Sequence, residues 1–277
     1  MKAFFLMPFL LLACAGTATR TAPSLPEGYT YENLQEVRLE KELEEISGIE
    51  YEGGGSFLAH NDEEGIIYRL EGEYKVKAAI PFAGEGDYEE IKKVGSQLYM
   101  LSSKGDLWSM QYKGTAVSGV EKHEWPGSKT EFEAMFHDPG KEQLVLVSKS
   151  AKADKEARRT HAYAFGLSEK RFHQEPVFSL GWEDAGRAAG KELKGLHPSA
   201  AAVHPLTGEI YLLASIERLL LVLGPDRQIR AAHRLDKKLF PQPEGITFDE
   251  RGNLYISNEA AEQEEATLLV FSYQTSK

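Results

Sequence analysis

Cysteine is almost absent from this sequence, because Cys14 is the only one among 277 residues. A chain with one cysteine cannot form an internal disulfide and cannot build a cysteine-rich zinc site. Stability must therefore come from the burial of side chains. The sequence is 42% hydrophobic, which over this length is enough for a substantial core.

Positive charge is also scarce, with 32 Lys and Arg against 43 Asp and Glu and a formal net charge of −11. An acidic surface disfavours nucleic acid, so we expect no nucleic-acid partner. It is compatible with cation binding, although solubility alone also explains it. The sequence lacks the Gly-X-Ser-X-Gly nucleophile motif, the Walker loop, the dinucleotide glycine pattern and the HExxH zinc motif.

The one long apolar run lies at the N-terminus, at residues 3–13, and is too short for a membrane span. It follows Met1-Lys2 and ends in Leu11-Leu12-Ala13-Cys14, which resembles a bacterial lipobox. We predict lipidation of Cys14 in a bacterial cell envelope, at the outer membrane facing the periplasm or the surface. The alternative is an ordinary signal peptide with an incidental cysteine. The predicted regions are a lipoprotein signal peptide at 1–13, a lipidated flexible tether at 14–27 and a single domain at 28–277.

A short phrase of sequence recurs five times in that domain, and its anchor residues follow one another at steps of 42, 44, 66 and 45. The anchors are Ser47, Glu89, Glu133, Ser199 and Glu244. A repeat of this length is typical of β-propellers. The long step contains two polar insertions, at 149–160 and 182–195, so it needs no hidden sixth repeat. The charged stretch 152–159 is interpreted as a solvated loop.

Each phrase predicts a first strand, and two further strands follow it after polar turns. A fourth strand is predicted at 76–82, 116–120, 175–180 and 229–235. The last repeat ends after three strands, so we expect residues 29–39 to supply its fourth. The prediction is an all-β, five-bladed β-propeller closed by an N-terminal strand, with six blades as the alternative. A β-sandwich needs no fixed period and is disfavoured.

Residues at one repeat position of a propeller surround its axis, which gathers Glu89, Glu133 and Glu244 at one channel mouth. Three carboxylates repel one another unless a cation or protons intervene. Oxygen ligands favour Ca²⁺ or Mg²⁺ over zinc, so we predict a calcium site on these glutamates. The alternative is that each glutamate only caps backbone amides of a neighbouring blade. Further candidates for the same mouth are Ser47, Asn61, Asp62, Ser199, Asn258 and Glu259.

Weaker candidates are the histidines near turns, His60, His137 and His197, and the pair Arg158-Arg159 as an anion contact. A sugar or peptide could also stack on Tyr88 and Phe132 at the mouth.

These motifs resemble the SdiA-regulated (YjiK-like) family of β-propellers. The resemblance rests on Glu45-Ile46-Ser47-Gly48-Ile49, Asn61-Asp62-Glu63, Asp87-Tyr88-Glu89, the stretch 198–208, Pro243-Glu244-Gly245-Ile246 and Ser257-Asn258-Glu259. It implies a periplasmic or surface propeller with Ca²⁺ at the channel mouth, and it implies no defined reaction.

The sequence thus favours a lipid-anchored, calcium-binding module for a small molecule or an envelope protein. The alternative is a calcium-dependent phosphate- or carboxyl-ester hydrolase, in which the bound ion polarises substrate or water.

Overall fold

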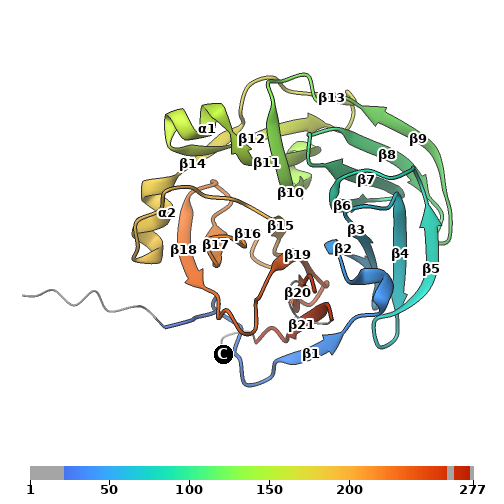
Figure 1. Cartoon of the computed structure of the whole chain (residues 1–277), viewed down its shortest axis with the longest axis horizontal. Helices are drawn as coiled ribbons and strands as arrows, with labels where there is room; N and C mark the ends of the chain where they lie inside the picture. The colour runs from blue at the N-terminus through green and yellow to red at the C-terminus, as the bar shows by residue number, and fades with distance from the viewer. Residues whose placement is uncertain (1–21, 261–264, 275–277) are drawn as a thin grey trace, which may run out of the picture.

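The computed structural model describes residues 22–260 and 265–274 and shows an all-β protein whose sheets radiate from a central axis (Figure 1). Within these ranges, 21 strands form five separate sheets. Neighbouring strands in a blade pair antiparallel from the inner strand outward, and in blade 3 both β13 and β14 pair with β12. The predicted five-bladed β-propeller is confirmed, and six blades are not favoured.

The blades follow one another along the chain. Blade 1 contains β2 (Ile46–Gly53), β3 (Ser56–Asn61), β4 (Ile66–Glu71) and β5 (Lys75–Pro81). Blade 2 contains β6 (Tyr88–Val94), β7 (Gln97–Ser102), β8 (Leu107–Tyr112) and β9 (Val117–His123). Blade 3 contains β10 (Thr130–Asp138), β11 (Gln143–Ala151), β12 (Arg159–Gly166), β13 (Arg171–Phe172) and β14 (Phe178–Gly181).

Blade 4 contains β15 (Ala200–Val203), β16 (Ile210–Ala214), β17 (Leu219–Leu223) and β18 (Ile229–Arg234). Blade 5 contains β19 (Pro243–Phe248), β20 (Leu254–Asn258), β21 (Thr267–Phe271) and β1 (Gln35–Arg38). Two 3₁₀ turns, η1 (Lys41–Leu43) and η2 (Pro139–Lys141), lie between strands.

The ring closes on its inner strands. Each inner strand contacts the inner strands of both neighbouring blades, in the circle β2, β6, β10, β15, β19 and back to β2. The apolar side chains divide in the same way, into five clusters that each join two adjacent blades. Each blade is therefore covered on both faces by its neighbours. This explains the near-continuous apolar runs in strands such as β17.

The N-terminal segment completes the last blade, as predicted. Strand β1 pairs antiparallel with β21, with Gln35 opposite Val270. The strand is shorter than the predicted 29–39, because Tyr29 is held in the core instead. Its hydroxyl donates a hydrogen bond of 2.6 Å to the carbonyl of Gly252. The packed chain also begins before residue 28, since Pro26 is already buried.

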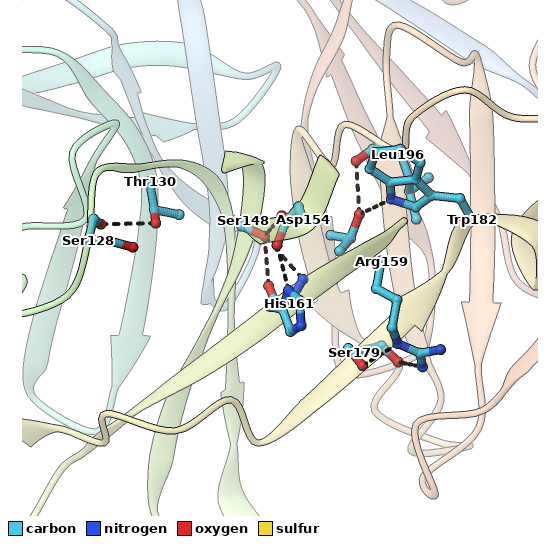
Figure 2. Close-up of polar contacts among 10 residues, drawn as sticks. Ser128, Thr130, Ser148, Asp154, Arg159, His161, Ser179, Trp182 and Leu196 are labelled. Carbon is cyan, nitrogen blue, oxygen red and sulfur yellow. Dashed lines mark hydrogen bonds and ion pairs between the residues drawn. The ribbon is translucent and has the colours of Figure 1, made fainter. Parts of the chain in front are cut away.

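The long repeat step holds two helices, so the stretch interpreted as a charged loop is partly helical. Helix α1 (Lys152–Ala157) follows β11, and α2 (Trp182–Ala189) follows β14. Figure 2 shows how α1 is attached: buried Asp154 contacts the Nδ1 of His161 at 2.5 Å and accepts a 2.5 Å bond from the Ser148 hydroxyl.

Helix α2 is attached through its first residue. The indole N–H of Trp182 donates to the Thr160 hydroxyl at 3.0 Å, and that hydroxyl donates to the Leu196 carbonyl at 3.0 Å (Figure 2). Helix α1 therefore packs on blade 3, α2 packs between the outer strands β14 of blade 3 and β18 of blade 4, and the ring itself remains five-fold.

None of the helices in the described ranges is long and apolar enough to cross a membrane. The predicted signal peptide, the predicted lipidation at Cys14 and most of the predicted tether lie outside the described residues.

Candidate functional site at the channel mouth

The repeated anchor residue is a β-bulge in four of the five blades. The ladder of the inner strand shifts register at Ser47, Glu89, Glu133 and Glu244, and in each case the anchor is the residue without an opposite partner. A bulge re-aims the side chain that it releases from the ladder. The repeat therefore places one released side chain per blade at the same end of the inner strands.

A second ring lies beside the first. It consists of the residue that directly follows the second strand of each blade, or its equivalent in the longer β11: Asp62, Ser103, Lys149, Ser215 and Glu259. Members of the two rings contact each other. Lys149 forms an ion pair with Glu133, and Ser215 is hydrogen-bonded to Glu244.

One ammonium group interacts with all three predicted glutamates. The Nζ of Lys149 pairs with Oε1 of Glu133, and its charge also lowers the pKa of Glu89 and of Glu244. The negative charge of Glu244 in turn raises the pKa of Glu89. The prediction that distant glutamates share one mouth is consistent with these contacts, and Lys149 is the counter-charge that the repeat alignment did not include.

Burial and like charge raise the pKa values of Glu89 and Glu244. The pKa of Glu89 is raised to about 8, chiefly by burial and then by Asp87, with which it shares a hydrogen bond. The pKa of Glu244 is raised to about 7 by burial, and Glu259 adds to the rise. Lys149 opposes both shifts without cancelling them. At neutral pH a proton therefore remains on a large share of these groups.

A second acidic group adjoins the first at blades 1 and 5. The pKa of Glu259 is raised to about 7 by burial, by Glu45, with which it shares a hydrogen bond, and by Asp62. Burial also raises the pKa of Asp62, and Glu45 and Asp87 add to it. Seven carboxyl groups thus interact across the mouth, namely Glu45, Asp62, Glu63, Asp87, Glu89, Glu244 and Glu259, and Glu133 joins them through Lys149.

The remaining predicted mouth residues have structural contacts. The buried Ser199 hydroxyl donates to the Pro243 carbonyl at 2.9 Å and so links blade 4 to blade 5. Asn61 accepts the Glu64 N–H at 2.8 Å and so closes the turn after β3. Asn258 is buried and donates to the Leu239 carbonyl at 3.1 Å. Ser47 is partly buried at its bulge.

The fit of a metal ion to this mouth can be judged from the side chains. In residues 22–260 and 265–274, no three Asp, Glu, His or Cys side chains are arranged so that they could hold one ion. Two carboxylate oxygens, Oε2 of Glu133 and Oδ1 of Asp62, are nevertheless buried without a hydrogen-bond partner. The mouth thus lacks the preformed cage of six to eight oxygens that calcium prefers. The calcium assignment stays a prediction.

The interior of the channel holds charged groups that sequence reasoning missed. Lys92 is buried between Glu90, at 3.1 Å, and Glu50, at 3.4 Å. Gly48 leaves the space for this group, because a Cβ there would lie 2.5 Å from the Nε2 of His60 and 3.2 Å from Glu90. The pKa of His60 is lowered to about 4 by burial, so its ring is neutral.

The opposite mouth is a cavity of about 370 Å³ that is lined by all five inner strands and includes His137. His197 is engaged elsewhere, with its Nδ1 2.7 Å from Glu217. Tyr88 and Phe132 are 2% and 0% exposed. The prediction that these two rings stack on a ligand is therefore wrong, because they pack between blades.

Lys149 could have been found from the sequence by extending the repeat by one residue. Aligning the second strands at Asn61, Ser102, Ser148, Ala214 and Asn258 places Lys149 in line with Asp62 and Glu259. The β-bulges, in contrast, could not have been predicted from the sequence of a single repeat.

Comparisons with known proteins agree with this fold. The glutaminyl cyclase of Myxococcus xanthus has a similar structure, with a TM-score of 0.58 and 10% identity over 87% of this chain and 96% of that one. A luciferin-regenerating enzyme aligns with a TM-score of 0.52 and 10% identity over 86% and 95%. At such identity these likenesses concern the fold alone. No curated protein matches the sequence.

The model of one family matches part of the chain. The matched residues, 178–262, cover blade 4 and the first two strands of blade 5, and they include Ser199, Glu244 and Glu259. The resemblance to the SdiA-regulated family is therefore confirmed over residues 178–262.

Proposed function

We propose that this protein is a binding module that captures a cationic group at the acidic mouth of its channel. One observation carries the proposal: seven carboxyl groups interact there, and Lys149 forms an ion pair with Glu133 and interacts with only two of the seven, Glu89 and Glu244. The carboxylates of Glu89, Glu244 and Glu259 are costly to ionise in this setting, and an arriving cation would remove that cost.

Proton displacement follows from the same electrostatics. At pH 7 a large fraction of the Glu89, Glu244 and Glu259 carboxyl groups is protonated, because their pKa values are about 8, 7 and 7. A cation stabilises the ionised forms, so binding at the mouth releases protons. The buried, unpartnered oxygens of Glu133 and Asp62 supply further acceptors.

Isothermal titration of the purified protein tests this function. Ca²⁺ and a small alkylammonium are each titrated in two buffers of different ionisation enthalpy. We expect one of them to bind, with a Kd of about 0.1–1 mM if calcium behaves as in other extracellular modules. The apparent enthalpy should change with the buffer, because protons are released. The double variant Glu89→Gln, Glu244→Gln should lose binding.

Glu36→Gln is the matched control, because Glu36 is exposed on the outer strand β1. It should bind as the wild type does. Absence of heat with every cation, or equal binding by the double variant, would refute a cation site at this mouth.

We further propose that the module is held at a bacterial envelope by lipid on Cys14. The support for this is the lipobox-like ending Leu11-Leu12-Ala13-Cys14. A ligand reaching the mouth would then come from the periplasm or from outside the cell.

One feature supports hydrolysis as a second candidate. Groups with a pKa of 7 to 8 in a concave site are suited to general acid or base catalysis, and Glu89 and Glu244 have such values. Phosphate and carboxylic esters are assayed with and without Ca²⁺. Turnover that is lost in Glu89→Gln with the fold intact would favour the hydrolase. Cation binding without turnover would favour the binding module.

A further inference from the structure

The chemistry of the one charged group already held by the mouth identifies a class of ligand. Lys149 contributes a primary ammonium, which has three N–H donors and no acceptor. One of its contacts goes to Oε1 of Glu133, and Glu89 and Glu244 lie close enough to interact with its charge. The three glutamates come from three different blades, 2, 3 and 5.

The acceptors outnumber what Lys149 uses. Oε2 of Glu133 is buried and has no hydrogen-bond partner, and Glu133 as a whole is only 8% exposed. An unsatisfied buried carboxylate oxygen costs free energy. It therefore indicates a site that accepts one more donor than the protein itself provides.

Lys149 can leave this position without breaking a sheet. It lies beyond the last residue pair of β11 with β12, and in the ladder with β10 it is the unpaired residue between Ser148 and Ser150. Its side chain is 29% exposed, so a change of rotamer can carry the ammonium to solvent.

We propose that Glu89, Glu133 and Glu244 form a receptor for a primary ammonium group, and that Lys149 occupies it until a ligand amine displaces it. The inference rests on the proposed cation-binding function and specifies its ligand class. Lys149 then acts as an internal competitor that offsets the repulsion between the carboxylates and sets a threshold for ligand affinity. Discrimination against quaternary ammonium follows, because that cation has no N–H to donate.

Chemical rescue of Lys149→Ala tests the proposal. The substitution removes Cγ, Cδ, Cε and Nζ, which together correspond to n-propylammonium. We expect the melting temperature to fall by several degrees and to be restored, in a saturable manner, by n-propylammonium. Tetramethylammonium at equal ionic strength should not restore it. Lys152→Ala, which alters an exposed lysine on α1, should show neither effect.

If both ammonium ions restored the melting temperature equally, charge screening would explain the restoration and the proposal would be overturned. Restoration by Ca²⁺ but not by propylammonium would also overturn it, because that result would identify a metal site. If Lys149→Ala does not fold, Lys149→Gln keeps most of the length and removes the charge. That variant should bind n-propylammonium at least tenfold more tightly than the wild type, and unchanged affinity would refute the role of Lys149 as competitor.

The two proposals fail differently. Absence of cation binding in the wild type contradicts the proposed function, although amine rescue of Lys149→Ala could still occur. Cation binding in the wild type without amine rescue contradicts the ammonium receptor alone.

Discussion

Replacing Glu89 by glutamine should alter how the stability of this protein depends on pH. The carboxyl of Glu89 has a pKa of about 8 in the folded protein, against an ordinary value of 4.5. Its protonated form is therefore the one that the fold favours. The stability from this group is fully present below pH 4.5 and is lost as the pH rises through 8.

The size of the effect follows from linkage. Between pH 6 and pH 9 the unfolded carboxyl is ionised throughout, whereas the folded one ionises only near the upper end. The free energy of unfolding should fall by about 2.6 kcal/mol over this range because of Glu89 alone, as an order of magnitude. Glutamine resembles the protonated acid and does not titrate. Glu89→Gln should therefore match the wild type at pH 6 and exceed it at pH 9.

Thermal unfolding of both proteins at pH 6, 7, 8 and 9 measures this difference. For a chain of this size, 2.6 kcal/mol corresponds to a shift of about 5–10 °C in melting temperature. Glu36→Gln is the control for the loss of a surface carboxylate. Its melting temperature should depend on pH as that of the wild type does. Parallel curves for Glu89→Gln as well would show that Glu89 is ionised in the folded protein, and the electrostatic account of the mouth would then be wrong.

Three further predictions concern other parts of the chain. Tyr29→Phe removes the bond to the Gly252 carbonyl and should cost about 1–3 kcal/mol in denaturant unfolding; no loss would mean that water replaces the hydroxyl. Lys92→Met should destabilise the fold by about 3–5 kcal/mol at pH 9. The loss should be smaller at pH 6, because Glu90 has a pKa of about 8 and is protonated there. Equal losses at both pH values would contradict this prediction. Cys14→Ser should abolish metabolic labelling by palmitate and release the protein from membranes, and continued labelling would refute the lipobox.

The repeat made the architecture predictable from the chain alone. Five occurrences of one phrase, each followed by alternating turns and apolar runs, predict blades, and a last repeat that is one strand short predicts closure by the N-terminal segment. Both predictions depend on local hydrophobic pattern and on counting, which sequence carries directly. The pattern could not show that Tyr29 enters the core rather than the sheet, since that depends on the carbonyl of Gly252, 223 residues away.

The candidate site was predictable in its carboxylates and not in its cation. Repeat position alone assigns Glu89, Glu133 and Glu244 to one mouth, because equivalent residues of a closed ring surround one axis. The pKa values depend on burial and on neighbours such as Asp87 that stand outside the repeat position. Tyr88 and Phe132 show the converse error: an aromatic next to a site residue has the opposite orientation on a strand, and here it faces the neighbouring blade.

What the sequence determined by itself is the periodic part of this protein: the number of blades, their order, and the repeated glutamates that blades 2, 3 and 5 contribute. The tertiary structure decided the rest, because bulge geometry aims each anchor side chain and the second ring places Lys149 among the glutamates. A charge pattern can be counted along a chain, whereas its neutralisation depends on distances that exist only after the ring has closed.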